Sequence, residues 1–277
     1  VKCFFSEETY ASLSGAGAAE DTSDYRKAYR SLKDISVLYE DENILLLNKP
    51  AGVLTQKAKP EDLSLNEWLI GHLLAADAIK ETDLATFHPS VCNRLDRNTS
   101  GIVAAGRSLP GLQIMSEVIK DRSLGKYYVC VVRGIVKGEA RIEGWLTKNE
   151  KTNQVSIRKE ETPGSLPIRT AYRPLVSGNG YTLLEVHLIT GRSHQIRAHL
   201  AYLGHPVLGD IKYGNRKMNE RTGLKTQALC AQRLTFGRIP EENTLHYLSG
   251  RVIKLDDPAI VKQFDALTKT APHKTEE

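Results

Sequence analysis

The sequence predicts a mixed α+β domain with a mainly antiparallel central sheet flanked by helices and loops. Strand patterns occur next to one another, as over residues 36–47, and also singly between amphipathic helices. They outnumber what a regular βαβ repeat would supply, which disfavours a doubly wound parallel sheet. With 277 residues, 40% hydrophobic and 26% charged, the chain suffices for one large domain or two small ones.

The first thirty residues differ in composition from the rest. Residues 12–24 are small, polar and contain glycine, a composition typical of a flexible linker. We therefore expect residues 1–11 to be the remnant of an upstream module, 12–30 a linker, and 31–272 the main domain.

The first elements of this domain have local signals. Ser36–Tyr39 and Ile44–Leu47 flank a turn-rich segment and predict a hairpin. Ser64, followed three residues later by Glu67, forms a capping box that opens a helix with an apolar stripe. A second amphipathic helix begins near Ser108.

The later elements follow the same logic. Tyr127–Val132 is apolar, β-branched and aromatic, which predicts a buried strand, and Tyr181–Ile189 alternates as a half-buried strand does. A helix is expected over Ser193–Leu203, with Gly204 as its stop. Asp257-Pro258 opens a last helix, because proline suits the first helical position.

Charge and cysteine content narrow the function classes. Lys+Arg minus Asp+Glu is 38 − 33 = +5, a mild excess that suits a polyanionic partner. The four cysteines are far apart with no C-x-x-C pair, which disfavours a zinc site or a disulfide framework. No apolar run approaches the ~20 residues that cross a bilayer. We expect a cytoplasmic protein with reduced thiols, no metal and no membrane contact.

Residues 93–101 are the first segment unusually rich in specific polar groups. Asp96 lies between Arg94 and Arg97, and a nearby guanidinium favours the ionised carboxylate. A carboxylate held against a substrate can act as a nucleophile. A simple polar turn with solvated arginines is the alternative.

Residues 190–200 are the second such segment. They follow a strand, turn at a glycine and enter a helix, so Arg192 is expected near free helix N–H groups that attract anions. That turn could bind phosphate or pair Arg192 with a buried carboxylate. His194 and His199 are five residues apart, which does not fit the i, i+4 spacing of a metal-binding helix.

Taken together, these segments resemble the motifs of pseudouridine synthases of the large-subunit ribosomal RNA type (the RluA/RluC/RluD branch). The matching motifs occur in family order over residues 35–255: Asn48-Lys49-Pro50-Ala51-Gly52, Arg94-Leu95-Asp96-Arg97-Asn98-Thr99-Ser100-Gly101, Lys126-Tyr127-Tyr128, Thr190–Arg197, Gly204-His205-Pro206, Leu208-Gly209-Asp210, Leu229-Cys230-Ala231 and Leu234-Thr235-Phe236. One position departs, because the family usually has His where this chain has Asn93. Residues 1–11 resemble the end of an S4-type RNA-binding module.

The resemblance implies the pseudouridine synthase catalytic fold and isomerisation of uridine in RNA to pseudouridine. This reaction needs neither a metal nor a cofactor. Asp96 would be the nucleophile or base, attacking the ribose C1′, adding to C6 of uracil or removing a ribose proton. Arg192 would be its cationic partner, and Tyr128 would be a catalytic residue that stacks on the uracil and could handle the proton at C5.

The target uridine must leave its stack, and in relatives the residue matching Arg94 fills the vacated space. The other expected RNA-contact and uracil-pocket residues lie in the same motifs: Lys49, Arg97 and Arg197 for RNA, and Ile196 and Leu208 for the pocket. Ribosomal RNA is the expected partner, transfer RNA remains possible, and the chain is expected to be monomeric.

Two other functions stay open from sequence alone. A catalytically silent RNA-binding or ribosome-assembly factor would fit Asn93 and the shortened N-terminal module. A sugar hydrolase would need a second carboxylate, which the motifs do not offer. Residues 138–165 are expected to be a solvated loop, with a variable surface that contributes to RNA specificity as the alternative.

Overall fold

The computed structural model describes residues 21–214, 216–256 and 258–269. The predicted remnant, 1–11, lies outside these residues, as does 12–20 of the predicted linker. The rest of that linker is a helix, α2 (Ser23–Ser31), which begins after Asp21–Thr22 and buries Ala28. The Tyr29 ring lies 5.6 Å from that of Trp68 on α3 (Leu65–Ala75). The predicted linker is wrong over 23–30, because this segment packs against α3.

One sheet organises the described residues. Its strands are β1 (Ser36–Glu40), β2 (Ile44–Lys49), β3 (Ser90–Val91), β4 (Ser100–Gly106), β5 (Leu124–Arg133), β6 (Ala140–Asn149), β7 (Gln154–Arg158), β8 (Leu166–Gly178), β9 (Tyr181–Leu188), β10 (Leu229–Phe236) and β11 (Val252–Lys254). Their order is β1-β2-β4-β10-β5-β9-β8-β6-β7, with β3 on β4 and β11 on β10. Every pairing between these strands is antiparallel except β4 with β10. The predicted α+β class is confirmed.

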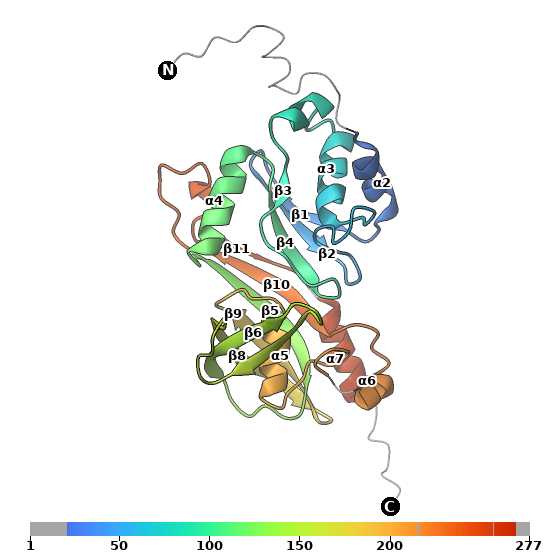
Figure 1. The fold of residues 1–277 in the computed structure, drawn as a ribbon, viewed down its shortest axis with the longest axis vertical. Helices are drawn as coiled ribbons and strands as arrows, with labels where there is room; N and C mark the ends of the chain where they lie inside the picture. The colour runs from blue at the N-terminus through green and yellow to red at the C-terminus, as the bar shows by residue number, and fades with distance from the viewer. Residues whose placement is uncertain (1–20, 215, 257, 270–277) are drawn as a thin grey trace, which may run out of the picture.

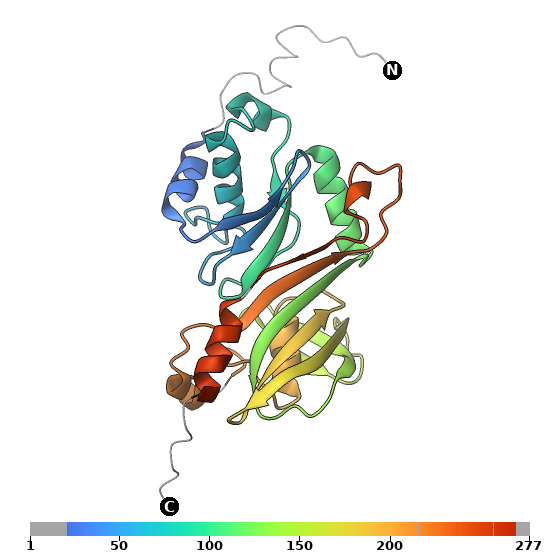
Figure 2. The same ribbon diagram turned by 180° about the vertical axis from the view of Figure 1, so that it is seen from behind.

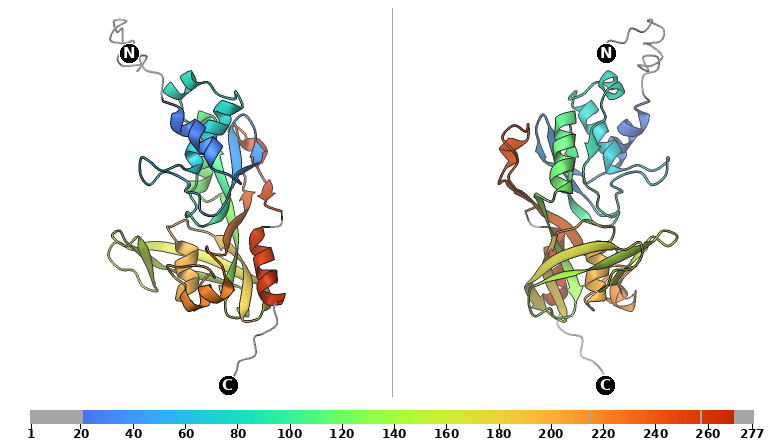
Figure 3. Two further views of the ribbon diagram at one scale, coloured as in Figure 1. Left: turned by 90° about the vertical axis from the view of Figure 1, so that its right-hand side faces the viewer. Right: turned by 60° about the vertical axis from the view of Figure 1, so that its left-hand side comes forward.

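The strands β5 and β10 run through the middle of the molecule and join two halves (Figure 1). One half carries α2, α3 and α4 (Leu109–Lys120) beside β1–β4. The other carries α5 (Gln195–Tyr202), α6 (Arg216–Thr222) and α7 (Ala259–Lys269), with α7 plainly visible from behind (Figure 2). The β6–β7 hairpin, at one end of the sheet, projects to one side of the molecule in side view (Figure 3). Within the described ranges, no helix has the length and apolar character to cross a bilayer.

Local sequence signals set several boundaries as predicted. The Ser64 Oγ accepts from the Asn66 N–H and donates to the Glu67 carboxylate at 2.5 Å, so the cap of α3 is formed. Ser108 caps α4 by accepting from the Gly111 N–H. Gly204 follows α5 with φ +84, a conformation that L side chains rarely adopt.

The predicted loop over residues 138–165 is wrong. It contains β6 and β7, which pair with each other, while β6 also pairs with β8. Apart from the buried Gly144 and Leu146, most side chains of β6 are exposed or half-buried. A hairpin at the edge of a sheet is covered on one face only, so its exposed face is as rich in charged residues as a loop. This composition obscures the alternation of apolar and polar residues in the sequence.

Alternation along the central strands builds one apolar core on each face of the sheet. On β5, Tyr128, Cys130 and Val132 belong to one core, and Val129 and Val131 to the other. Over residues 128–132 of β5, even-numbered side chains therefore pack into one core and odd-numbered side chains face the other side of the sheet.

Acid should destabilise the protein through His199, which lies under β8 and is 1% exposed, with its Nδ1 3.2 Å from the Thr170 Oγ1. Burial lowers the pKa of His199 from 6.5 to about 4. Below pH 6.5 the unfolded chain protonates this imidazole and the folded chain does not, so the free energy of unfolding falls until pH reaches about 4. The loss is about 1.4 kcal/mol per pH unit.

Urea unfolding at pH 7 and pH 5 checks this prediction. His199→Asn keeps a polar group near the Nδ1 position, and it should lose about 2 kcal/mol less than the parent protein over that interval. Equal pH dependence in the two proteins would rule out a buried neutral imidazole.

Candidate functional site

The loop that carries Asp96 connects β3 to β4 and is held by side-chain hydrogen bonds at Leu95 and Thr99. The Thr55 hydroxyl donates to the Leu95 carbonyl at 2.9 Å and accepts from the Leu95 N–H at 3.1 Å. Gln227 Nε2 donates to the Thr99 Oγ1 at 2.9 Å. A carboxylate on so constrained a backbone needs little reorganisation to meet a substrate.

Gly101 explains why the motif ends in glycine. Its φ is +113, and a Cβ there would lie 2.2 Å from the carbonyl oxygen of Ala231. The close approach arises where β4 runs parallel to β10, with Gly101 opposite Ala231. Only glycine allows the strand after the Asp96 loop to enter the sheet at this point.

The structure corrects the expected role of Lys49. The residue is 0% exposed, and its Nζ donates to the carbonyls of Pro50, Val53 and Arg97 at 3.0, 2.8 and 3.0 Å. Burial lowers the pKa of Lys49 to about 8, although Asp96 opposes this shift. All three ammonium protons have partners, so Lys49 ties the loop after β2 to the Asp96 loop and does not reach a phosphate.

Lys49→Met should destabilise the protein without changing the salt dependence of RNA binding. Three carbonyls lose their donor, which should lower the free energy of unfolding by about 2 kcal/mol. A phosphate contact would instead reduce the slope of log affinity against log salt by about one. Urea unfolding and a salt titration of RNA affinity separate the two outcomes, and a smaller slope at unchanged stability would contradict the structural role.

A second constrained turn follows β9. Gln195, 2% exposed, accepts from the Thr190 Oγ1 and the Arg192 N–H through Oε1, and donates through Nε2 to the Arg169 carbonyl. His194 precedes α5 with φ +52. The turn therefore fixes the start of α5, and residues on the first turn of that helix are held in direction.

Arg197, on this first turn, joins two carboxylates. Its Nη1 donates to Asp96 Oδ2 at 2.6 Å, while Nε and Nη2 donate to the two oxygens of Asp210 at 2.7 and 2.9 Å. Side-chain exposure is 7% for Arg197, 0% for Asp210 and 26% for Asp96. The planar guanidinium therefore uses one edge to hold Asp210 bidentately and presents the other to the partly accessible Asp96.

Asp210 anchors this arrangement. Burial alone would raise the pKa of Asp210, but the hydrogen bonds and charge of Arg197, with the N–H groups of Tyr213 and Lys212, hold it below its usual value. Burial likewise opposes the charge of Arg197, yet the two carboxylates raise its pKa. The three groups thus form a carboxylate–guanidinium–carboxylate chain in which Arg197 contacts both acids.

The predicted partner of Asp96 is therefore corrected from Arg192 to Arg197. Arg192 is exposed in the turn, and its backbone N–H contacts Gln195. Arg197, predicted to contact RNA, is instead buried beside Asp96 and Asp210. Sequence reasoning missed Asp210 as a functional residue, although its Leu-Gly-Asp motif was noted.

His194 and Tyr213 lie beside the same carboxylate. The Tyr213 hydroxyl accepts from the Val155 N–H at 2.9 Å and is 2.8 Å from His194 Nδ1. We assign its proton to a bond toward Nδ1, which places the hydrogen of a neutral imidazole on Nε2, 3.9 Å from Asp96 Oδ1. Burial, then Arg197 and Lys212, hold the pKa of His194 below 6.5 against the opposing charge of Asp96. A neutral His194 thus points N–H toward Asp96.

The other sequence-predicted residues divide between buried and exposed positions. Tyr128 is 6% exposed and shares one core with Ile196, whereas Leu208 belongs to the core on the opposite face. Burial first, and then the charge of Asp96, raise the pKa of Tyr128. The charge of Asp96 therefore acts on the Tyr128 hydroxyl. The two expected pocket residues, Ile196 and Leu208, lie in different cores and do not line one pocket together.

The two arginines that flank Asp96 are exposed. Arg97 donates from Nε to the Gly52 carbonyl at 3.0 Å, and Arg94 projects from the same loop. Asn93, where relatives usually have His, accepts from the Ala104 N–H at 2.8 Å and so ties the loop to β4. Across the described residues, no group of three or more His, Cys, Asp and Glu side chains is placed to hold a metal ion.

Comparisons with known proteins agree with this geometry. The sequence signature of the RNA pseudouridylate synthase family matches residues 43–202. Ribosomal large subunit pseudouridine synthase D of Borreliella burgdorferi is 30% identical over 183 residues, 65% of this chain and 55% of that protein. Ribosomal large subunit pseudouridine synthase C of Vibrio cholerae is 28% identical over 237 residues, 84% of this chain and 68% of that protein. The chain thus matches about half of the first relative's length and two thirds of the second's.

Solved structures show the same fold. Human RNA pseudouridylate synthase domain containing 4 superposes with a TM-score of 0.66 at 19% identity, covering 88% of this chain and 96% of that one. Human RNA pseudouridylate synthase domain containing 1 gives a TM-score of 0.58 at 22% identity, covering 87% and 97%.

Proposed function

Because this chain belongs to the RNA pseudouridylate synthase family, we propose that it isomerises uridine in RNA to pseudouridine and that Asp96 carries the chemistry. The observation that supports this most directly is the carboxylate–guanidinium–carboxylate chain formed by Asp96, Arg197 and Asp210. It holds a partly accessible carboxylate at the end of a buried charge network, which is what a nucleophile or base in a folded enzyme requires.

The reaction conserves atoms and electrons. The bond from N1 of uracil to the ribose C1′ breaks, a bond from C5 to C1′ forms, and the proton at C5 is replaced by one at N1. Asp96 attacks C1′, adds to C6 or removes a ribose proton, and each route needs the carboxylate ionised beside the base. Arg197 binds Oδ2 of Asp96 and so fixes which oxygen faces the substrate.

The surrounding residues have supporting roles in this proposal. Tyr128 supplies an aromatic face for uracil and a hydroxyl whose raised pKa keeps it protonated and able to donate. Ile196 backs the base from the same core. Neutral His194 lies beside the carboxylate, with its Nε2 3.9 Å from Asp96 Oδ1.

The target base must be extruded before the reaction, because a uridine that is stacked and base-paired within the RNA cannot reach the Asp96 carboxylate. Arg94 is exposed two residues before Asp96, and its long planar side chain suits the space that the flipped base leaves. Arg97 and Arg192, both exposed on the two loops, supply positive charge for flanking phosphates.

Large-subunit ribosomal RNA is the proposed substrate, since the named relatives act on it, with transfer RNA as the second class to test. A silent RNA-binding factor would not need the carboxylate–guanidinium–carboxylate arrangement of Asp96, Arg197 and Asp210, and this arrangement is intact. Hydrolysis is disfavoured because Asp210 is buried with a lowered pKa, whereas a glycosidase needs a protonated carboxylic acid.

Tritium release from RNA labelled at C5 of uridine tests the proposal. Incubation of the protein with ribosomal and transfer RNA transcripts should release tritium without free uracil. Free uracil would identify a hydrolase, and binding without any release would identify the silent factor.

A further inference from the structure

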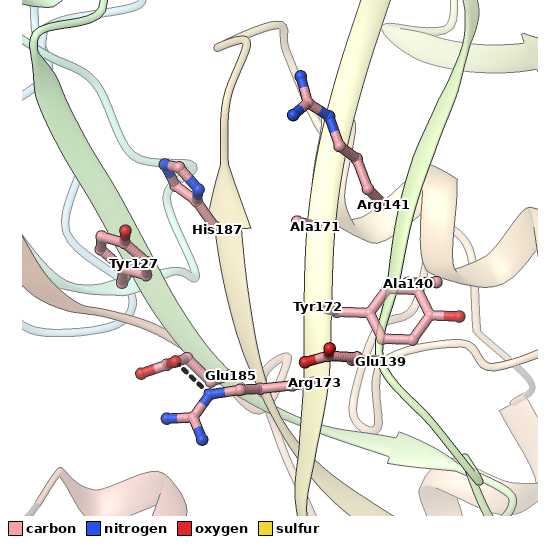
Figure 4. A pocket seen from close by; sticks show the side chains of 9 residues that line it. All are labelled: Tyr127, Glu139, Ala140, Arg141, Ala171, Tyr172, Arg173, Glu185 and His187. Atoms are coloured by element: carbon pink, nitrogen blue, oxygen red, sulfur yellow. Dashed lines mark hydrogen bonds and ion pairs between the residues drawn. The ribbon is translucent and has the colours of Figure 1, made fainter.

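A hollow of about 510 Å³ lies over strands β5, β9, β8 and β6, where Tyr127 and His187 face away from Tyr128 (Figure 4). Its lining residues come from β5, β6, β8 and β9, and the ones used below are Tyr127, Arg141, Ala171, Arg173, Glu185 and His187. Tyr127 and Tyr128 are consecutive on β5, so they point to opposite faces. The lining shares no residue with the Asp96 site, although one of its members, Tyr172, packs against the core that contains Tyr128.

A column of stacked planar groups forms one wall of this hollow. The Tyr127 and His187 rings are 4.4 Å apart and inclined by 13°, and the Arg233 Cζ lies 3.8 Å from the Tyr127 centroid. Sheet register produces the column, because Arg233 on β10 pairs with Tyr127 and Tyr127 pairs with His187 on β9. Directly paired residues point to the same face.

The column has a missing member at the next strand. His187 pairs with Ala171 on β8, and Ala171 pairs with Arg141 on β6. Strands are about 4.8 Å apart, so His187 and Arg141 start roughly 9.6 Å apart with only a methyl group between them. Aromatic pairs stack with centroids about 4.5 Å apart or more, and the space therefore fits one further planar group. Figure 4 shows the open space between His187 and Arg141 above Ala171.

The charges around the hollow leave Arg141 available. Glu185 accepts from Arg173 and Arg233, each at 2.8 Å, so those three side chains satisfy one another. The Arg141 side chain is 61% exposed, and its Nε lies 4.0 Å from the Glu143 Oε1, the outer limit of an ion pair.

His187 presents a neutral ring to the hollow. Burial, then the cations Arg233, Arg141 and Lys126, lower the pKa of His187 against the opposing Glu185. The ring is therefore uncharged at neutral pH, and it offers a π face rather than a competing cation.

We propose that this hollow binds one unpaired nucleobase of the RNA substrate, stacked between the His187 ring and the Arg141 guanidinium above Ala171. A base is planar on both faces, and a guanidinium that stacks on it also reaches the adjoining phosphate. Aromatic side chains on an open sheet face are a common platform for single-stranded RNA. The inference rests on RNA being the substrate, and it adds a second contact, remote from the isomerised uridine.

Two substitutions test the site. Ala171→Phe fills the missing position with the protein's own ring, and Arg141→Met removes the opposing cation while keeping a similar length. Each should weaken binding of a ribosomal RNA transcript about tenfold, because the base loses its stacking position or its cationic partner. Arg158→Met, on the neighbouring strand β7 outside the hollow, is the matched loss of charge and should change affinity less than threefold.

Fluorescence anisotropy gives the affinities, and thermal melting checks the folding of each variant. If Ala171→Phe fails to fold, Arg141→Met decides the result. Single-turnover isomerisation at saturating RNA should stay unchanged in both. Cross-linking of 4-thiouridine-substituted transcript to residue 127 or 187 should identify the contacted nucleotide.

Parental RNA affinity in both variants would overturn the proposed site. Weaker binding in a protein that makes no pseudouridine would leave the site standing and refute only the isomerase proposal.

Discussion

Asp96→Asn is expected to reduce the single-turnover rate of pseudouridine formation by at least about 10³-fold while RNA affinity changes little. Asparagine has nearly the same shape, and its amide oxygen can still accept from Arg197 Nη1, which now donates to Asp96 at 2.6 Å. Removal of the negative charge eliminates the nucleophile or base that every route requires.

The rate is measured by tritium release with enzyme in excess over RNA, and affinity by anisotropy. Asp256→Asn is the matched control, because that side chain is 91% exposed and should leave both quantities unchanged. A rate for Asp96→Asn within tenfold of the parent protein would place the chemistry on another residue.

Arg197→Met is expected to have the largest effect on stability. It leaves Asp210, 0% exposed, without its charge partner and also frees Asp96. Breaking a buried ion pair from one side costs about 3–5 kcal/mol, because the remaining charge stays buried. Isomerisation should be lost as well, since nothing then directs the Asp96 carboxylate.

Urea unfolding compares Arg197→Met with Arg197→Lys and with the double variant Arg197→Met/Asp210→Asn. Lysine has a point charge and cannot bridge both carboxylates, so it should restore only part of the stability. The double variant has no unpaired buried carboxylate and should recover roughly half of the loss. Stability of Arg197→Met within about 0.5 kcal/mol of the parent protein would contradict a buried charge chain.

Elements with local signals were predictable from the sequence. The Ser64 and Ser108 caps depend on side chains within three residues, and the alternation over residues 184–187 reflects burial of Leu184 and Val186 on one face. In contrast, α2 is fixed by its packing on α3, where a Cβ on Gly71 would lie 2.2 Å from the Tyr25 carbonyl oxygen. Such a contact between helices leaves no pattern in the sequence of either one.

The candidate site shows the same division. The motifs identified both loops, but neither segment tells which arginine faces Asp96. Arg192 and Arg197 differ because Gln195 closes the turn between them, which leaves one exposed and directs the other inward from α5. Lys49 was misassigned for a related reason, since a lysine is ordinarily exposed and only the fold shows three carbonyls around its Nζ.

Pseudouridine mapping by carbodiimide primer extension tests the central claim most directly. Ribosomal RNA from cells that lack this protein is compared with RNA from cells given back the parent protein or Asp96→Asn. The account predicts one or more carbodiimide stops that the parent protein restores and Asp96→Asn does not. Identical maps in all three samples, or equal restoration by Asp96→Asn, would contradict it.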